Sequence, residues 1–210
     1  AGLDQVIIYA DREHAANFAY LAGFSPRFEE ALLIVGLDGT PQAVLGTENI
    51  NMVRYTLAEL EGIHYPTFSL IGQPRQEVKS LKDILRDAGL KKGMTVGTVG
   101  WKYYHAKDGC PAGSFEIPHY IVETIHEVVG ETSSAGSGTD KGSIVRNVTD
   151  IFMSPYDGLR IVLEPEQVVV FEYAACLVAR SMLALMNYVD VGKTEMELAG
   201  RFQSMGIPLS

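Results

Sequence analysis

The chain has 210 residues, a length that allows one large domain or one domain and part of another. Its apolar share of 47% and charged share of 20% are typical of a folded globular protein and exclude a disordered one. The net charge of −9 argues against non-specific binding to nucleic acid or anionic membranes, because such binding needs basic patches. We see no apolar run that approaches a membrane span and no signal peptide, so we expect a cytoplasmic protein.

The first third of the chain predicts three strands and one helix. A β-branched run at residues 5–9 indicates a buried strand. Asp11 is a suitable N-cap for the helix that follows, and Gly23 is suited to end it in the left-handed conformation. Two apolar runs, 31–35 and 42–45, predict a hairpin, since the Asp-Gly pair between them favours tight turns.

The middle third alternates between strand and helix patterns. We predict weak helicity at 49–60, a strand at 64–70, an amphipathic helix at 76–88, a strand at 93–99 and a helix from Pro118 whose inner face holds Ile117, Ile121, Ile125 and Val128. Residues 131–143, rich in Ser, Gly and Thr, predict a flexible loop. Strands interleaved with helices, including one hairpin, indicate an α/β domain with a mixed sheet.

The last third of the chain predicts a strand and two helices that begin a second domain. A strand at 144–150 leads to a long helix at 163–188, and a capping box of Thr194 and Glu197 predicts a second helix. The long helix carries one apolar stripe of Val168, Phe171, Ala175, Val178, Met182, Leu185 and Met186. Such a stripe needs a covering layer, so we expect residues 1–160 to form one domain and 161–210 to begin a second that this sequence does not complete.

Three side chains could share a metal ion. His119, Glu123 and His126 lie on one helical face at spacings of four and three residues. They would form either a metal site on this chain or the solvated side of a helix whose opposite face is core. No fourth ligand is visible in the sequence.

The aromatic and sulfur-bearing residues each allow two interpretations. Trp101, Tyr103 and Tyr104 could stack on a ligand, or they could cover the core at a strand edge. Cys110 and Cys176 are far apart and form no metal or redox motif, so we expect Cys176 to be a free buried thiol on the long helix.

The loop from Tyr20 to Glu30, next to the end of the first helix, is rich in side chains that can bind a ligand. It holds a tyrosine, an arginine, a phenylalanine and two carboxylates where side chains are held but exposed. A functional contact and a solvated loop both fit this composition.

Two motifs together resemble a known family. Asn17-x-x-Tyr20-Leu21-x-Gly23-Phe24 before an apolar strand is similar to the start of the amino-terminal domain of the creatinase, prolidase and aminopeptidase P family. The tail agrees independently, because residues 150–153, 166–167, 174–175 and 192–199 resemble that family's passage into its pita-bread domain. The resemblance covers essentially the whole chain in the expected order.

The resemblance implies a fold and separate roles for its two domains. The amino-terminal domain would be a mixed, about six-stranded sheet flanked by helices, which dimerises and closes over the active site. The first helices of an incomplete pita-bread domain would follow it. That domain would either hold two divalent ions (Mn, Co or Zn) or, as in creatinases, use a histidine base without metal. The residues concerned would lie beyond Ser210, so this chain would carry no catalytic residue, metal or cofactor of its own.

For site residues, the resemblance implies contacts across a homodimer. Tyr20, Arg27 and Phe28 lie in the loop that would reach the substrate, a peptide or small molecule, although the spacing of Arg27 and Phe28 departs from the family pattern. An arginine suits this role because its planar guanidinium can bind a carboxylate through two hydrogen bonds. The competing interpretation is a non-enzymatic dimerisation or binding protein of the same fold.

Overall fold

The computed structural model describes residues 2–75, 78–105, 107, 109–111, 113–130 and 144–203. The described chain divides into two compact units, residues 1–161 and 162–210. The loop predicted at 131–143 lies outside the described residues.

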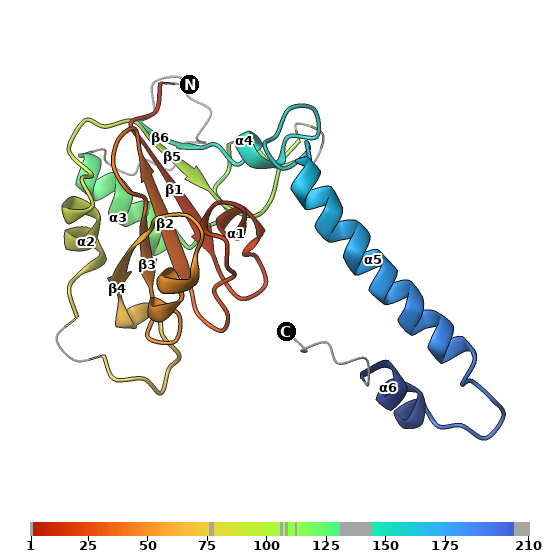
Figure 1. Ribbon diagram of the computed structural model, residues 1–210. Coiled ribbons are helices and arrows are strands. Elements are labelled where there is room, and N and C mark those ends of the chain that lie inside the picture. Colours follow the sequence, from red (N-terminus) through yellow and green to blue (C-terminus); the bar gives the residue numbers. More distant parts are fainter. Residues whose placement is uncertain are drawn as a thin grey trace. The chain divides into compact units, whose positions relative to one another are not determined.

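The first unit is built on a six-stranded mixed sheet (Figure 1). Its strands are β1 (Gln5–Ala10), β2 (Ala31–Gly36), β3 (Gln42–Leu45), β4 (Glu61–His64), β5 (Val96–Val99) and β6 (Val145–Asn147). The spatial order is β4-β3-β2-β1-β5-β6, in which β2 runs antiparallel to both neighbours and the other adjacent pairs are parallel. The sheet confirms the predicted α/β class.

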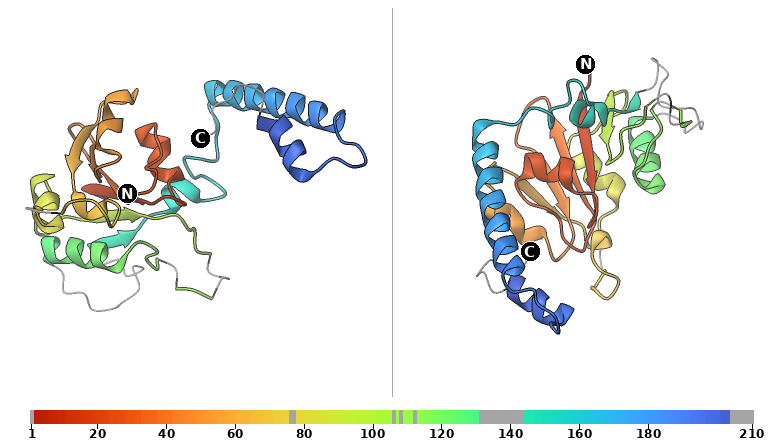
Figure 2. Two further views of the ribbon diagram at one scale, coloured as in Figure 1. Left: turned by 90° about the horizontal axis from the view of Figure 1, so that it is seen from below. Right: turned by 90° about the vertical axis from the view of Figure 1, so that its right-hand side faces the viewer.

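Helices cover both faces of this sheet. They are α1 (Ala16–Ala22), α2 (Leu81–Asp87), α3 (His119–Val129) and α4 (Asp150–Met153), with two 3₁₀ helices, η1 (Ile50–Tyr55) and η2 (Pro66–Phe68). The apolar side chains of α2 and α3 belong to one buried cluster, and those of α1 and α4 to another. In Figure 2 α1 lies on the opposite side of the sheet from α2 and α3.

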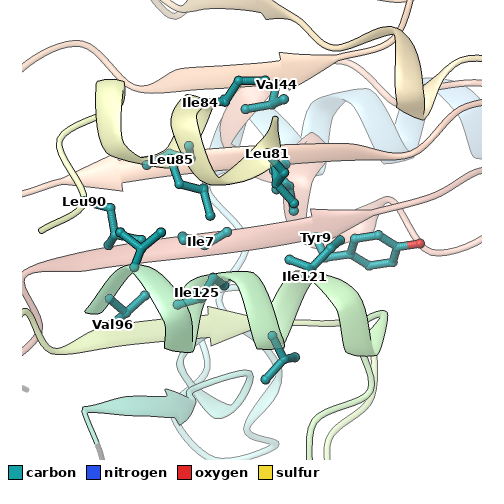
Figure 3. Close-up of a cluster of buried hydrophobic side chains, with 14 of the residues drawn as sticks. Ile7, Tyr9, Val44, Leu81, Ile84, Leu85, Leu90, Val96, Ile121 and Ile125 are labelled. Carbon is teal, nitrogen blue, oxygen red and sulfur yellow. The ribbon is translucent and has the colours of Figure 1, made fainter. Parts of the chain in front are cut away.

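Successive side chains of the inner strands belong alternately to the two buried clusters. Figure 3 shows Ile7 on β1 and Val96 on β5 gathered in one cluster with Leu85, Ile121 and other side chains from α2 and α3. Successive residues of a strand point to opposite faces, so Ile8 belongs to the second cluster instead. A sheet that is apolar on both faces has the continuous apolar runs from which we predicted the strands.

The predicted start of the first helix is wrong, whereas its end is right. Asp11 does not cap α1: its Oδ1 accepts hydrogen bonds from the backbone N–H of Glu13 at 2.9 Å and of His14 at 2.8 Å, which makes a local turn. The helix begins only at Ala16. Gly23 ends it with φ of 77°, as its position predicted.

Two other predicted elements differ from those observed. The strand predicted at 64–70 is wrong: β4 precedes it, and Pro66 opens η2, because proline fixes φ and lacks the N–H that a strand ladder needs. The helix predicted at 76–88 begins only at Leu81, where Ser80 caps it by accepting from the N–H of Asp83 at 3.1 Å. Residues 76 and 77 lie outside the described part of the chain.

The second unit is a helical hairpin of α5 (Pro165–Met186) and α6 (Glu195–Gln203), which lie against each other. Gln167 Oε1 accepts from the N–H of Glu164 at 2.9 Å at the start of α5. The predicted capping box of Thr194 and Glu197 is confirmed by reciprocal bonds of 2.8 and 3.3 Å.

Within this unit, the apolar stripe of α5 is not covered. Phe171 is 60% exposed and Met186 is 67% exposed, and among the described side chains of α5 only Ser181 is buried. Cys176 is exposed as well, so its predicted burial is wrong. By length and composition alone, α5 is also long and apolar enough to cross a membrane, which the sequence analysis did not predict. Core helices of soluble proteins share this property.

Candidate functional site at the carboxyl edge of the sheet

The topology brings most polar loops of the first unit to one edge of the sheet. Because β2 alone is reversed, the carboxyl ends of the other five strands and the amino end of β2 share this edge. We call it the carboxyl edge. In α/β sheets, ligands bind outside the carboxyl ends of the strands, where the direction of strand order reverses.

That reversal falls between β1 and β5. The chain proceeds from β1 through β2, β3 and β4 to one side, and then returns to place β5 and β6 on the other. Here the ring of His14, after β1, stacks on Trp101, after β5, with centroids 3.9 Å apart. His14 Nδ1 lies 3.0 Å from Asp11 Oδ1. Burial opposes ionisation of Asp11, but hydrogen bonds from His14 and from the backbone hold its pKa below the ordinary value.

The predicted functional loop is held at this edge by a buried carboxylate. Glu29 is only 3% exposed and accepts three hydrogen bonds: from the N–H of Glu48 at 3.0 Å, from the N–H of Asn49 at 3.1 Å and from Asn49 Nδ2 at 2.7 Å. These donors precede η1, so the carboxylate satisfies backbone groups at its start. Glu29 also explains Gly46, where a Cβ would lie 2.5 Å from the carboxylate carbon.

Asn49 also fixes the backbone of the predicted site residues. Its Nδ2 donates to the carbonyl of Arg27 at 2.9 Å, and its Oδ1 accepts from the N–H of Arg27 at 3.3 Å. Between Arg27 and Glu29, Phe28 has φ of 70°, the one non-glycine residue with positive φ in the described part of the chain. A phenylalanine in this region is strained, and such strain persists only where neighbouring contacts impose it.

The loop therefore presents an aromatic ring and two cations. Phe28 is 52% exposed, and the guanidinium carbons of Arg27 and Arg12 lie 5.5 and 5.7 Å from its ring centroid. These distances are within the range of cation–π interactions. Arg12 also lies 3.5 Å from Glu13.

Beside this loop lies an open cavity of about 390 Å³. It is lined by Asp11, Arg12, Glu13, Phe28, Glu29, Glu30, Thr67, Phe68, Ser69, Leu70, Ile71 and Arg75. Arg75 Nη2 donates to the carbonyl of Ser69 at 2.8 Å, which anchors one cation at the wall. The lining combines positive, negative and apolar groups, so it suits a small ligand that carries both charges.

Two tyrosines meet a single carboxylate on the cavity wall. Glu30 Oε1 accepts from the hydroxyl of Tyr9 at 3.0 Å, and Glu30 also accepts from that of Tyr120 at 3.3 Å. Burial, and then the charge of Glu30, raise the pKa of Tyr9 far above its ordinary value, and the same two causes raise the pKa of Tyr120. Both hydroxyls thus stay protonated and act as hydrogen-bond donors.

The other half of the carboxyl edge is a hydrogen-bond network around Glu116. Its Oε1 accepts from the N–H of Lys102 at 3.1 Å, and its Oε2 accepts from Asn147 Nδ2 at 3.1 Å. Thr149 Oγ1 accepts from the N–H of Gly100 at 2.9 Å and lies 3.2 Å from Glu116 Oε1. The network ties the end of β5 to that of β6 and orders the loop that carries Trp101.

Tyr20, the third predicted site residue, lies elsewhere. Its hydroxyl donates to the carbonyl of Leu159 at 3.2 Å, and its ring meets Phe152 edge to face at 6.3 Å. Nearby, Asn17 donates to the carbonyl of Gly100 at 2.7 Å and accepts from Arg160 at 2.8 Å. Of the three predicted site residues, Phe28 alone lines the cavity. Arg27 lies beside it over the Phe28 ring, and Tyr20 lies apart.

The side chains that the structure describes do not offer a donor set for a metal ion. In residues 2–130 and 144–203, apart from the gaps named above, no three His, Cys, Asp or Glu side chains gather as ligands. His119 Nε2 lies 3.6 Å from Glu123, while the ring of His126 lies edge to face against Phe115 at 6.4 Å. We therefore derive no chemical step through a metal held by these residues.

Several residues that build the site carried no signal in the sequence. Glu29 and Asn49 are 20 positions apart, and Glu116 and Asn147 are 31 apart, so neither pair forms a local motif. His14 and Trp101 meet only because β1 and β5 are neighbours. These contacts become visible only when the order of the strands in the sheet is known.

Comparisons with known proteins identify the class of fold. No protein-family model and no curated protein sequence matches the chain. Solved structures do match: the mixed sheet with its flanking helices is the fold of the amino-terminal part of prolidases and Xaa-Pro peptidases, as the sequence motifs predicted.

Three of these structures illustrate the likeness. Prolidase from Pyrococcus furiosus matches with a TM-score of 0.55 at 18% identity, over 95% of this chain and 44% of its own. X-Pro aminopeptidase from Thermotoga maritima MSB8 matches with 0.58 at 14% identity, over 96% and 45%. Prolidase from Pyrococcus horikoshii OT3 matches with 0.57 at 14% identity, over 95% and 43%. The chain thus spans less than half the length of the structures it matches.

Proposed function

We propose that this chain is the non-catalytic amino-terminal portion of a prolidase- or Xaa-Pro-peptidase-like hydrolase. The observation that carries the proposal is the fold likeness over 95% of this chain and only 44% of a prolidase. In this proposal, the catalytic residues and two divalent ions lie in the remainder of a longer protein, which cleaves X-Pro peptides or related C–N bonds.

Within that protein, the carboxyl edge would help to cover the active site. The loop of Arg27 and Phe28 is exposed yet rigidly anchored, since Asn49 and the buried Glu29 fix its backbone. Rigid anchoring lowers the entropic cost of ordering a side chain on a ligand. We propose that Arg27 binds the substrate carboxylate and that Phe28 packs on its apolar part, across a homodimer.

The adjoining cavity supports a ligand with two charged ends. Arg12 and Arg75 line it together with Glu13 and Glu30, and a dipeptide carries both an ammonium and a carboxylate. A volume of about 390 Å³ is in the range of small-ligand sites.

The test is hydrolysis of an X-Pro dipeptide by the longer protein that contains this chain. We expect turnover that a chelator abolishes and that added Mn²⁺, Co²⁺ or Zn²⁺ restores. The 210-residue chain alone should give no turnover with or without metal. Turnover by the 210-residue chain would contradict the proposal.

The second candidate is a non-enzymatic dimerisation or binding protein. The uncovered apolar side chains of α5 favour it, because an exposed apolar face of this kind is typical of interaction surfaces. A longer protein that binds no metal, hydrolyses no X-Pro peptide and sediments as a dimer would support this candidate instead.

A further inference from the structure

A ring contact joins two loops of the carboxyl edge that lie far apart in the sequence. His14 follows β1 and Trp101 follows β5, and these two strands are neighbours in the sheet. The ring centroids are 3.9 Å apart and the ring planes meet at 24°, so the rings are stacked. The His14 side chain is 34% exposed and Trp101 is 38% exposed, so protons from solvent can reach the contact.

One carboxylate orients the ring of His14. Its Nδ1 lies 3.0 Å from Oδ1 and 3.1 Å from Oδ2 of Asp11. Since an ionised carboxylate only accepts hydrogen bonds, Nδ1 carries the proton of this contact, and Nε2 is the nitrogen that gains a proton when the ring becomes charged. Burial raises the pKa of Asp11, but the hydrogen bonds from His14 and Glu13 and the charge of His14 outweigh it and hold that pKa below its ordinary value. Asp11 is therefore charged wherever His14 ionises.

Asp11 also shapes the turn that follows β1. Its Oδ1 accepts from the backbone N–H groups of Glu13 and His14 at 2.9 and 2.8 Å. Asp11, Arg12 and Glu13 all line the cavity at the carboxyl edge. The contact between His14 and Asp11 therefore bears on the conformation of three residues of the cavity wall.

On the other side of the contact, Trp101 belongs to a segment that is held by its backbone. The N–H of Gly100 donates to Thr149 Oγ1 at 2.9 Å, and the N–H of Lys102 donates to Glu116 Oε1 at 3.1 Å. Neither of these bonds involves a histidine, so they persist when His14 gains or loses a proton. Trp101 is thus a fixed surface on which the imidazole ring rests.

Protonation of His14 strengthens both of its contacts. The bond to Asp11 becomes a bond between opposite charges, and such hydrogen bonds are roughly twice as strong as neutral ones. A charged imidazole is also attracted to the negative face of the Trp101 indole ring. The charged ring therefore holds the turn of residues 11–14 more firmly than the neutral ring does.

The other charged groups around the contact do not reverse this effect. Lys102 Nζ lies 5.8 Å from the centroid of the tryptophan ring, whereas Asp11 lies 3.0 Å from the imidazole itself, so the attraction to Asp11 prevails. Glu116, which accepts from the N–H of Lys102, adds a further negative charge. Arg12 and Glu13 lie 3.5 Å from each other and offset each other's charge. The helix α1 contains no charged residue.

We propose that the ring of His14 is a pH-dependent latch on the turn of residues 11–14. When the ring is charged, it holds the turn between Asp11 and Trp101, and when it is neutral, it holds the turn less firmly. Because this turn forms part of the cavity wall, the latch regulates binding in the cavity. That last step rests on the function proposed above, whereas the latch itself does not.

The test of the latch is the fluorescence of Trp101 in the 210-residue chain between about pH 8 and about pH 5. Trp101 is the one tryptophan of the sequence, so the emission reports on this contact. We expect the emission to fall in a one-proton step as His14 becomes charged, because a charged imidazole quenches an adjacent indole more strongly than a neutral one. The NMR signals of the His14 ring should shift over the same pH range, which identifies the proton in the unaltered protein.

Two variants assign the step. His14→Gln should abolish it, since glutamine can still donate to Asp11 but does not ionise. His119→Gln is the matched control, because the His119 side chain is 86% exposed on α3 and this variant should keep the step.

The hold on the turn is measured separately, as the protection of the Glu13 backbone N–H from hydrogen exchange. We expect severalfold greater protection at about pH 5 than at about pH 8 in the parent protein, because the charged ring keeps the turn closed. In His14→Gln the protection should be the same at both pH values. The latch is overturned by an emission that does not change with pH, by a step that persists in His14→Gln, or by protection of Glu13 that is independent of pH in the parent.

The link to the cavity is tested in the longer protein that contains this chain. KM for an X-Pro dipeptide should rise with pH more steeply in the parent than in His14→Gln, because the cavity wall is less ordered when His14 is neutral. The same pH dependence of KM in both proteins would overturn this link. An absence of hydrolysis, with the fluorescence step intact, would contradict the proposed function and not the latch.

Discussion

The contact between Asn49 and Glu29 shows how one side chain sets the geometry of a surface loop. Asn49 donates both to the buried carboxylate at 2.7 Å and to the carbonyl of Arg27 at 2.9 Å. It therefore couples a charge inside the fold to the backbone of a residue that faces solvent. The strained φ of Phe28 follows from this coupling, because residues on both sides of it are fixed.

Removing the Asn49 side chain should destabilise the fold. We expect Asn49→Ala to lower the free energy of unfolding by about 1–3 kcal/mol, because buried Glu29 loses one of its three donors. Urea denaturation measures the change. Asn51→Ala is the matched control, since Asn51 is exposed on η1 and should change stability by less than about 0.5 kcal/mol. Equal effects of the two variants would contradict this account of the loop.

The raised pKa of Tyr9 predicts how the free energy of unfolding changes at alkaline pH. Burial and the charge of Glu30 raise the pKa of Tyr9 in the folded chain, whereas the unfolded chain ionises it at the ordinary pKa of 10. The unfolded state therefore releases this proton first, and the stabilisation is complete below pH 10 and is lost as the pH rises above it.

We expect Tyr9→Phe to reduce that alkaline loss of stability. The free energy of unfolding, measured from about pH 8 to about pH 11, should fall less steeply for the variant than for the parent protein. Tyr55→Phe is the control, because Tyr55 is 79% exposed and should leave the slope unchanged. A slope that is the same in all three proteins would show that Tyr9 ionises normally in the folded chain.

At this scale the sequence singled out the loop of Arg27 and Phe28 but did not show how that loop is built. Arg27 and Phe28 stood out because an arginine and an aromatic residue follow a helix-ending glycine. Glu29 and Asn49 could not be paired, since their contact depends on β2 and β3 being neighbours. The predicted burial of Cys176 failed because an apolar stripe on a helix does not state whether anything covers it.

Among the elements, α2 shows how a cap decides where a helix begins. Its apolar positions Leu81, Ile84 and Leu85 are buried as predicted, but the periodic pattern extends before the first helical residue. Ser80 marks the true start, with its Oγ accepting from the N–H of Asp83 at 3.1 Å and donating to the Asp83 carboxylate at 2.6 Å. The Ser80 hydroxyl and nearby cations hold the pKa of Asp83 below its ordinary value.

We expect Ser80→Ala to lower the free energy of unfolding by about 1 kcal/mol, because one N–H at the start of α2 loses its acceptor. Ser80→Asn should restore most of that loss, since asparagine also caps helices well. Chemical denaturation of the three proteins measures the difference. If alanine is tolerated as well as asparagine, the cap does not stabilise α2.

The element that the sequence misplaced lies beside a proline. β4 comes before Tyr65-Pro66, whereas our prediction put a strand across that proline. The error has a physical reason: residues 61–64 are mostly exposed, so they lack the apolar run that marked the inner strands. Edge strands are harder to predict for this reason.

Over the whole molecule, the two end motifs predicted the fold better than any single element did. The likeness to prolidase structures confirms the mixed sheet and its flanking helices. The sequence could not supply the strand order, because the return from β4 to β5 on the far side of β1 leaves no local pattern. That order is what places His14 against Trp101 and creates the carboxyl edge.

In the second unit, the exposed apolar side chains of α5 need a covering layer. A 22-residue helix whose apolar side chains remain exposed within its own unit has too little packing to be stable by itself. Further structure in a longer protein, a second copy of the chain or a membrane would each supply an apolar environment. We propose the first, since the matched structures are more than twice as long as the aligned part.

The most direct test of the central claim is kcat/KM for an X-Pro dipeptide in the longer protein that contains this chain. Arg27→Ala is compared with Arg54→Ala, a change of an exposed arginine on η1 that lies outside the proposed site. We predict that Arg27→Ala lowers kcat/KM at least about tenfold, as the loss of a charge-assisted hydrogen bond would, while Arg54→Ala leaves it unchanged. Equal kcat/KM for the two variants would contradict the claim that the carboxyl edge contacts the substrate.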